Sequence, residues 1–235
     1  MVEFNGALLT DIDPRIKISE VVVGAPAIQT VSIIPAISDG ERFARKNYGP
    51  RNVTVYFLVM EPDETERTRI IDEIEAWAHS KKEEKLIVPQ SEDGYLMAVC
   101  TKLPDDAAKE FWSVLTIVFK AHNPYFLAHT ESHAQIGDEI NVRRYAGPNW
   151  RIEQDIEKLI ESPSWEMGDK QIGFSYVNAG KLVLDKEKQT ALLDGNSILP
   201  SMLLGSRFFE LEHGRNTIEA QNGASGTIYW RERWI

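Results

Sequence analysis

The stretch NVTVYFLVMEPDETERTRIIDEIEAWAHSKK, residues 52–82, decides the fold class of the first part of the chain. Its first nine residues are rich in valine and aromatic side chains, which is typical of a β-strand. The segment that follows predicts a helix, because Asp63 can cap its N-terminus with Glu66 three residues further on. Its apolar residues recur at helical spacing and form one stripe, which we expect to lie on a sheet. The residues of this stripe are Ile70, Ile71, Ile74, Trp77 and Ala78.

Further strand patterns surround this strand–helix pair. Residues 15–23 precede it, and residues 84–89, 95–103 and 111–126 follow it, each with alternating or short continuous apolar runs. Residues 38–50, SDGERFARKNYGP, combine glycine, asparagine, proline and charges without periodicity, which predicts a long loop or a hairpin tip. The first part of the chain is therefore predicted to be β-rich with one packed helix.

The second part of the chain predicts a different architecture. Residues 128–155 are polar and broken by glycine and proline, which indicates a domain boundary near residue 130. Beyond it, short strand patterns, including FFELEHG at 208–214, are joined by tight turns such as Asp194–Gly195 and Asn222–Gly223. This spacing predicts an antiparallel β-sandwich. The two predicted domains are residues 1–130 and 131–235.

The composition excludes several classes of protein. With 43% hydrophobic and 26% charged residues, the chain is neither collagen-like, mucin-like nor wholly disordered. Its net charge of −10 disfavours a nucleic-acid binder that works through a broad basic surface. The single cysteine, Cys100, cannot form an intramolecular disulfide, and its apolar flanks predict an inert thiol in a buried strand. Neither a membrane-spanning stretch nor a secretory signal is visible, so we expect assembly in a cytoplasm.

Motifs that carry chemistry are weak in this sequence. His129 and His133 have the i, i+4 spacing of helical zinc ligands, but their polar surroundings favour a solvated linker. The sequence contains no phosphate-binding glycine loop and no nucleophile elbow. We therefore predict no enzyme activity, no cofactor and no metal site.

The tryptophans raise a second hypothesis, a two-domain carbohydrate-binding module that stacks sugars on surface indole rings. Its candidate residues are Trp150, Trp165, Trp230 and Trp234. In a strand, Trp230, Glu232 and Trp234 would share one face, which suits such a platform. An aromatic ladder that closes a core or a subunit contact is the favoured alternative, because large aromatic side chains dominate both.

Taken in order along the chain, the motifs resemble the distal tail proteins of long-tailed bacteriophages of Gram-positive hosts. The resemblance starts at FNG, residues 4–6, and continues through the strand and capped helix to KLIVPQSEDGYLMAVCTK, residues 85–102. It then takes in HNPYF at 122–126 and the terminal run from Asn178 to Ile235. It covers nearly the whole chain.

This resemblance implies a fold and a role. The fold is an N-terminal belt domain that closes into a hexameric ring, followed by a C-terminal galectin-like β-sandwich. The role is that of a structural adaptor at the virion tail tip, which joins the tail tube to the tail hub and to receptor-binding or baseplate proteins. A hexamer would multiply the net charge of −10 six-fold, and an acidic channel wall would let DNA pass without specific binding.

A galectin-like fold does not by itself imply sugar binding, since function depends on placed residues. The nearest match to the first galectin strand motif, His213–Asn216, runs in the wrong order. The nearest match to the second, Trp230–Trp234, has the wrong spacing. Both departures disfavour lectin activity.

Two segments are candidate subunit contacts. Residues 39–48 mix arginine with aromatic side chains, as interface centres do. The opening strand, with Val2 and Phe4, could pair edge to edge with the adjacent subunit. A solvated loop and an ordinary core strand are the respective alternatives. The candidate contact residues of the first segment are Arg42, Phe43, Arg45, Lys46 and Tyr48.

Overall fold

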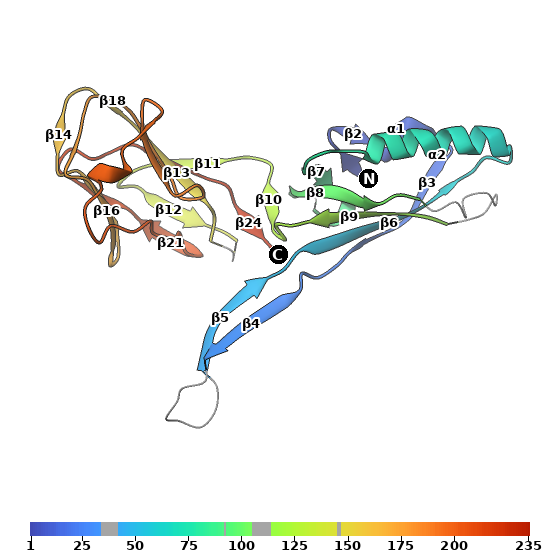
Figure 1. Cartoon of the computed structure of the whole chain (residues 1–235), viewed down its shortest axis with the longest axis horizontal. Coiled ribbons are helices and arrows are strands. Elements are labelled where there is room, and N and C mark those ends of the chain that lie inside the picture. Colours follow the sequence, from blue (N-terminus) through green and yellow to red (C-terminus); the bar gives the residue numbers. More distant parts are fainter. Residues whose placement is uncertain (34–41, 92, 105–113, 145–146) are drawn as a thin grey trace. The chain divides into compact units, whose positions relative to one another are not determined.

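The computed structural model describes residues 1–33, 42–91, 93–104, 114–144 and 147–235, and it divides into two compact units. Unit 1 comprises Met1–Phe126 together with Ile235, and unit 2 comprises Leu127–Trp234. Strands dominate both units, which confirms the predicted mainly β fold class (Figure 1). Within the described ranges, no helix combines the length and the apolar character that crossing a membrane requires.

Unit 1 is built around one antiparallel sheet with strand order β2-β1-β7-β8-β9-β6-β3. Strands β4 and β5 form a separate two-stranded sheet. The elements are β1 (Glu3–Phe4), β2 (Ala7–Leu8), α1 (Leu9–Ile12), β3 (Ile16–Val23), β4 (Ile28–Ile33), β5 (Arg42–Tyr48), β6 (Arg51–Val59), α2 (Glu64–Ala78), β7 (Glu84–Ile87), the short 3-10 helix η1 (Pro89–Ser91), β8 (Gly94–Lys102) and β9 (Leu115–Ala121).

Helix α2 lies along one face of the main sheet (Figure 1). The predicted apolar stripe is confirmed, since Ile70, Ile74 and Ala78 are buried and the other two members are half-buried. The Trp77 ring meets the rings of Phe4 and Phe119 edge-on, at centroid distances of 5.8 and 6.0 Å. The helix ends at Ala78, a turn earlier than the sequence pattern suggests.

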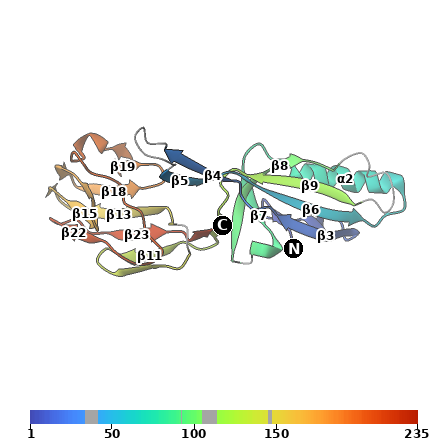
Figure 2. The ribbon, with the colours of Figure 1, turned by 90° about the horizontal axis from the view of Figure 1, so that it is seen from below.

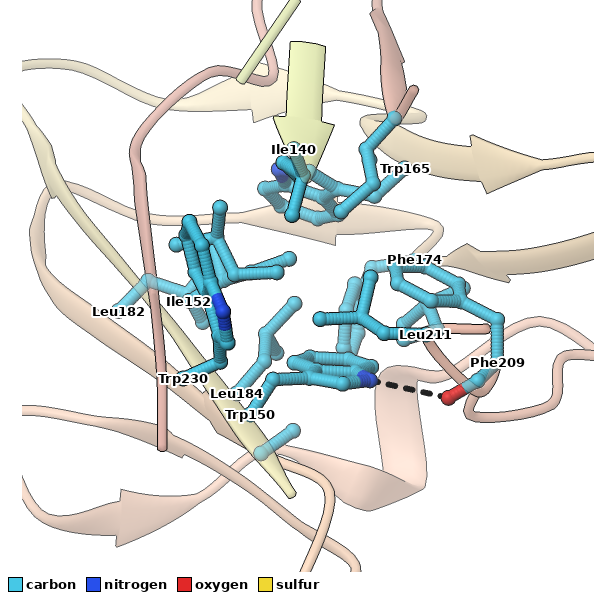
Figure 3. Close-up of a cluster of buried hydrophobic side chains, with 14 of the residues drawn as sticks. Ile140, Trp150, Ile152, Trp165, Phe174, Leu182, Leu184, Phe209, Leu211 and Trp230 are labelled. Atoms are coloured by element: carbon cyan, nitrogen blue, oxygen red, sulfur yellow. Dashed lines mark hydrogen bonds between the residues drawn. The ribbon is translucent and has the colours of Figure 1, made fainter. Parts of the chain in front are cut away.

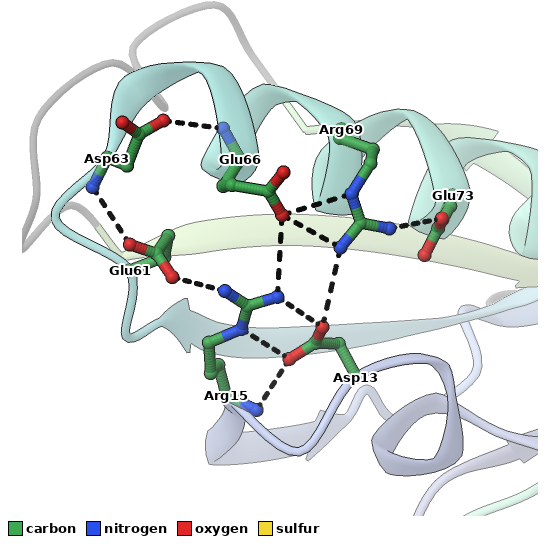
Figure 4. A network of polar contacts seen from close by, with 7 residues as sticks. All are labelled: Asp13, Arg15, Glu61, Asp63, Glu66, Arg69 and Glu73. Carbon is green, nitrogen blue, oxygen red and sulfur yellow. Dashed lines mark hydrogen bonds and ion pairs between the residues drawn. The ribbon is translucent and has the colours of Figure 1, made fainter.

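A network of ion pairs fixes the N-terminal end of α2 (Figure 4). Arg15, at the start of β3, donates through Nε and Nη2 to the two carboxylate oxygens of Asp13, each at 2.8 Å, and also pairs with Glu61. Arg69 of α2 lies 3.9 Å from the same Asp13 carboxylate and 3.1 Å from Glu66. The hydrogen bonds from Arg15 lower the pKa of Asp13 to about 2, so this carboxylate stays charged far below neutral pH.

The N-cap of α2 forms as its sequence predicts. The Asp63 side chain accepts a hydrogen bond of 2.9 Å from the backbone N–H of Glu66. Glu61 in turn accepts from the backbone N–H of Asp63 at 2.9 Å, which ties the cap to the network of Arg15.

Unit 2 contains a six-stranded antiparallel sheet of order β11-β23-β13-β18-β19-β20 and several smaller sheets. The smaller sheets pair β16-β15-β22, β12-β21 and β14-β17. Figure 2 shows β11, β23, β13, β18 and β19 of the six-stranded sheet side by side in this order. The elements are β10 (Phe126–Ala128), β11 (Ser132–Gln135), β12 (Glu139–Val142), β13 (Trp150–Ile156), β14 (Ile160–Glu161), β15 (Ser164–Met167), β16 (Lys170–Gly173), β17 (Tyr176–Val177), β18 (Gly180–Asp185), β19 (Thr190–Leu193), β20 (Asn196–Ser197), the short 3-10 helix η3 (Leu199–Ser201), β21 (Gly214–Thr217), β22 (Glu219–Gln221), β23 (Thr227–Trp230) and β24 (Arg233–Trp234).

Side chains from the six-stranded sheet and from the smaller sheets meet in one core, as in a β-sandwich (Figure 3). Trp150 lies at its centre: its ring stacks on Phe209 at 4.5 Å, and its indole N–H donates to the Phe209 carbonyl oxygen at 3.0 Å. The predicted strand at 208–214 is wrong, because regular pairing begins only at Gly214. Phe209 and Leu211 are nevertheless fully buried, so the apolar pattern there reports core packing rather than a strand.

The two predicted turns with positive φ are confirmed. Asp194 and Gly195 have φ of 48° and 80°, and Asn222 and Gly223 have φ of 54° and 80°. These values suit the tight turns that join neighbouring strands of a sheet.

Candidate functional site

Strands β4 and β5, which we call the arm, continue the β3–β6 pair of the main sheet. The ladder runs from Val23 opposite Val53, through a hydrogen bond of 2.8 Å from Gly24 N to Asn52 O, to Ile28 opposite Tyr48. Of the two alternatives predicted for residues 38–50, the long loop is wrong for residues 42–48, which form β5. The antiparallel pairing of β5 with β4 agrees with the alternative of a hairpin, and residues 34–41 lie outside the described part. Figure 1 shows β4 and β5 as a two-stranded ribbon that follows on from β3 and β6, and among the described residues they form a sheet of their own.

The arm has no core of its own. Ile28 is 59% exposed and Val31 is 38% exposed. Because these two positions lie three residues apart in a strand, they point to opposite faces of the ribbon. An isolated two-stranded sheet is marginally stable in water, and the arm leaves an apolar side chain exposed on each face.

The arm is also basic within an acidic chain. Strands β4 and β5 contain three basic residues and no acidic one, whereas the whole chain carries −10. Lys46 places its ammonium 4.9 Å from the centre of the Tyr48 ring, and this ring meets Tyr125 at 6.1 Å. The other predicted contact residues of this segment, Arg42, Phe43 and Arg45, are paired with β4 through their backbone, and their side chains lie outside the described part.

Arg51, where the arm joins the main sheet, is a buried cation that has no acidic partner among the residues that the structure describes. It is 4% exposed, and its Nε has no hydrogen-bond partner among the described residues. The guanidinium lies 4.9 Å from the centre of the Phe126 ring. Burial lowers the pKa of Arg51, because moving a charged group out of water costs free energy and so disfavours the protonated form.

The opening strand is not available for edge pairing. Val2 and Phe4 are each 1% exposed, and β1 is paired with β2 on one side and with β7 on the other. The Phe4 ring packs at 4.9 Å from Phe119 in the core of unit 1. The prediction of a subunit contact at Val2 and Phe4 is therefore wrong, and the alternative, an ordinary core strand, is confirmed.

The tryptophans proposed to stack on sugars are mostly core residues. Trp150, Trp165 and Trp230 are 2%, 0% and 6% exposed, so no sugar can reach their faces. Trp234 is half-buried, and the Arg144 guanidinium lies 4.4 Å from the centre of its ring. The hypothesis of a surface tryptophan platform is wrong for the first three residues, because their rings fill the core of unit 2.

The histidines and the cysteine fall at separate positions. His133 lies in strand β11, not on a helix, and its ring is 6.0 Å from that of Tyr229. In the described ranges, no group of three or more His, Cys, Asp or Glu is placed to hold a metal ion. Cys100 is half-buried, and burial raises the pKa of its thiol, which favours the protonated, unreactive form.

Comparisons with known proteins match both the C-terminal part and the whole chain. Residues 149–234 match the family model of the siphovirus-type tail component, C-terminal domain. The crystal structure of SPP1 Dit (gp 19.1), described as a paradigm of the hub adsorption apparatus in phages that infect Gram-positive bacteria, is similar with a TM-score of 0.78. That likeness covers 100% of this chain and 98% of SPP1 Dit at 17% sequence identity.

A chain of the phage P2 baseplate, in its activated conformation with Ca, is similar with a TM-score of 0.44 and 9% identity over 91% of each chain. No curated protein sequence matches. Residues 149–234 therefore match the siphovirus-type tail component, C-terminal domain, and the whole chain has the fold of SPP1 Dit, so the resemblance to distal tail proteins predicted from the sequence is confirmed.

Proposed function

We propose that this protein is a tail-tip adaptor of a siphovirus or of a prophage-derived element, and that six copies close into a ring through the belt domain, residues 1–130. The ring joins the tail tube to the tail hub and to receptor-binding or baseplate proteins. The C-terminal domain, residues 131–235, is a galectin-like sandwich in this proposal. Assembly takes place in the cytoplasm of the bacterial host, and the protein has no catalytic role.

The observation that carries this proposal is the arm. Its apolar side chains are exposed on both faces, and Ile28 is 59% exposed, although a two-stranded ribbon needs a third partner for stability. A neighbouring copy that receives the arm would bury Ile28 and Val31 and would complete the ribbon. Repetition of this head-to-tail contact around an axis generates a closed ring.

Arg51 supports the same assembly. A buried guanidinium whose Nε lacks a partner within the described residues is stabilised when a carboxylate or carbonyl group of a neighbour reaches it. The basic arm and the net charge of −10 also favour contact between the arm of one copy and the acidic surface of the next. In the assembled ring, an acidic channel wall would repel DNA phosphates and let DNA pass without specific binding.

Native mass spectrometry of the purified full chain tests the proposal, with negative-stain images to identify rings. We expect a hexamer for the wild-type chain, alone or with tail tube protein added. The variant Ile28→Glu should shift the distribution to monomers, because it places a charge in the proposed contact while leaving the core of unit 1 untouched.

Leu204→Glu is the matched control, since Leu204 is a fully exposed aliphatic residue in unit 2. It should form rings as the wild type does. A monomer at every concentration, with and without tail tube protein, would contradict the proposed ring, and equal assembly of Ile28→Glu and wild type would remove the arm from the contact.

A further inference from the structure

Two hollows on the surface of unit 2 share the side chain of Tyr176 and neighbouring Ser175. One has a volume of about 380 Å³ and runs past Asn178 and Ser197 toward η3. The other has a volume of about 440 Å³ and is lined by Leu159, Glu161 and Ser162. We call the two together the Tyr176 groove. Each volume lies in the range of small-molecule sites, about 300–1,000 Å³.

Tyr176 offers an open aromatic face at the centre of this groove. Tyr176 belongs to the paired strand β17, yet the residue is 50% exposed to solvent. The next residue of the same strand, Val177, is 2% exposed, so the exposure of Tyr176 follows from strand alternation. An aromatic ring with an uncovered face packs well against the C–H groups of a sugar ring.

The rim of the groove carries polar groups that the chain itself does not use. Among the described residues, the side chains of Glu161, Ser162, Asn178 and Ser197 have no hydrogen bond, and the same holds for the Tyr176 hydroxyl. Together they supply hydroxyl, amide and carboxylate groups, which both donate and accept. Such a mixed set matches a ligand that is rich in hydroxyl groups.

The backbone around the groove is held in place. Ser162 adopts φ of 49°, an uncommon conformation for a residue other than glycine. Its N–H donates to Ser175 O at 3.0 Å, and its carbonyl oxygen accepts from the Asn222 side chain at 2.8 Å. Ser175 N–H donates in turn to Ser201 O at 2.9 Å. A rigid site of this kind loses little conformational entropy on binding.

The charge of the lining residues indicates which class of ligand the Tyr176 groove can bind. Glu161 is the one ionised side chain among the described residues that line the two hollows, and no cation lines either of them. A phosphate-bearing or acidic ligand would therefore meet repulsion without a compensating contact. We propose that the Tyr176 groove binds a neutral oligosaccharide, with one sugar unit stacked on Tyr176 and its neighbour in the adjoining hollow. This surface role goes beyond the proposed ring, which depends on unit 1.

The test is a glycan array of neutral and charged oligosaccharides probed with the full chain, followed by calorimetric titration of the best neutral tetrasaccharide. We expect binding in the high-micromolar to millimolar range. Tyr176→Ala should weaken it by about ten-fold or more, while Tyr176→Phe, which keeps the ring, should stay within about three-fold of the wild type. Asn178→Ala should fall between them.

Leu204→Ala is the control, because it removes a fully exposed apolar side chain of unit 2 that lines neither hollow, and it should leave glycan binding unchanged. Thermal unfolding and native mass spectrometry verify that each variant folds and assembles as the wild type does. Absence of binding to every neutral glycan, binding of charged glycans alone, or equal binding by Tyr176→Ala and wild type would each overturn the proposal. A loss of rings with retained glycan binding would instead count against the proposed assembly only.

Discussion

Strands β5 and β6 are separated only by Gly49 and Pro50, yet they differ in where their side chains find partners. In β6, every second residue is buried, and Val53, Val55 and Phe57 are each 0% exposed. In the arm, the described side chains of β4 and β5 are mostly exposed. The difference teaches that one continuous ribbon contains a part whose side chains the chain buries by itself and a part whose described side chains stay mostly exposed.

The largest loss of folding stability should come from a substitution in the core strand β6. Phe57→Ala removes a fully buried ring from β6 and leaves a cavity, so we expect it to lower the free energy of unfolding by about 3–5 kcal/mol. Urea denaturation at neutral pH, followed by circular dichroism, measures this change. A loss below about 1 kcal/mol would mean that β6 is not the centre of the unit 1 core.

The ion-pair network at the start of α2 should show the next largest effect, and it depends on pH. The folded pKa of Asp13 is about 2, below the value of about 3.9 in an unfolded chain, so the ionised carboxylate stabilises the fold. This contribution is present above pH 4 and is lost as the pH falls toward 2. Asp13→Asn should therefore lower the free energy of unfolding at pH 7 by about 2 kcal/mol.

Urea denaturation of wild type and Asp13→Asn at pH 7 and at pH 2.5, about half a unit above the lowered pKa, tests the sign of this effect. The difference between the two proteins should shrink at the lower pH, because the wild-type carboxylate becomes partly protonated there. A difference that stays constant or grows on acidification would contradict the assigned role of Asp13.

Arg51 lies at the junction of β5 and β6, and its substitution should have opposite effects on the stability of the single chain and on assembly. Arg51→Met keeps the length of the side chain and removes an unpaired buried charge, so the single chain should gain up to about 1 kcal/mol of stability. If the proposed ring forms, the same variant should weaken it, because a neighbouring copy would lose the guanidinium that we propose it pairs with. Chemical denaturation of the monomer and native mass spectrometry separate the two effects, and a large loss of monomer stability would show that Arg51 is already satisfied within the chain.

The smallest change in stability should come from the arm. Ile28→Ala alters a side chain that is 59% exposed, so the free energy of unfolding should change by less than about 0.5 kcal/mol. Ring formation should nevertheless weaken, in contrast to Phe57→Ala, whose defect lies in folding. A stability loss as large as that of Phe57→Ala would mean that the arm packs within its own chain.

Residue patterns predict the part of unit 1 that buries its own side chains. Strand β6 and helix α2 follow from alternation, from the Asp63 cap and from the apolar stripe, because each of these signals reflects burial within the chain. The sequence of β5 predicts only a loop or a hairpin tip for the complementary reason: the described side chains of this strand are mostly exposed, so its sequence shows no alternation of apolar and polar residues. The burial of Val2 and Phe4 depends on β7 pairing with β1, a contact between distant segments.

The candidate sites were harder to predict than the fold. Exposed and buried tryptophans look alike in sequence, and Trp150, Trp165 and Trp230 proved to fill the core of unit 2. The Tyr176 groove has no sequence signature, because it combines β17 with a turn and a 3-10 helix that lie apart along the chain. The segment around Lys46 and Tyr48 did have a signal, its mixture of arginine and aromatic residues, and that mixture remains a prediction of contact.

The entry and exit of unit 2 lie side by side, since the Ala128 N–H donates to Glu232 O at 2.9 Å. A domain whose first and last segments are neighbours can be exchanged by recombination at two nearby points without stretching the rest of the chain. The residues between these two points can then change in sequence independently of the rest of the chain. For a tail component, that separation lets one lineage alter unit 2 while unit 1 is inherited intact.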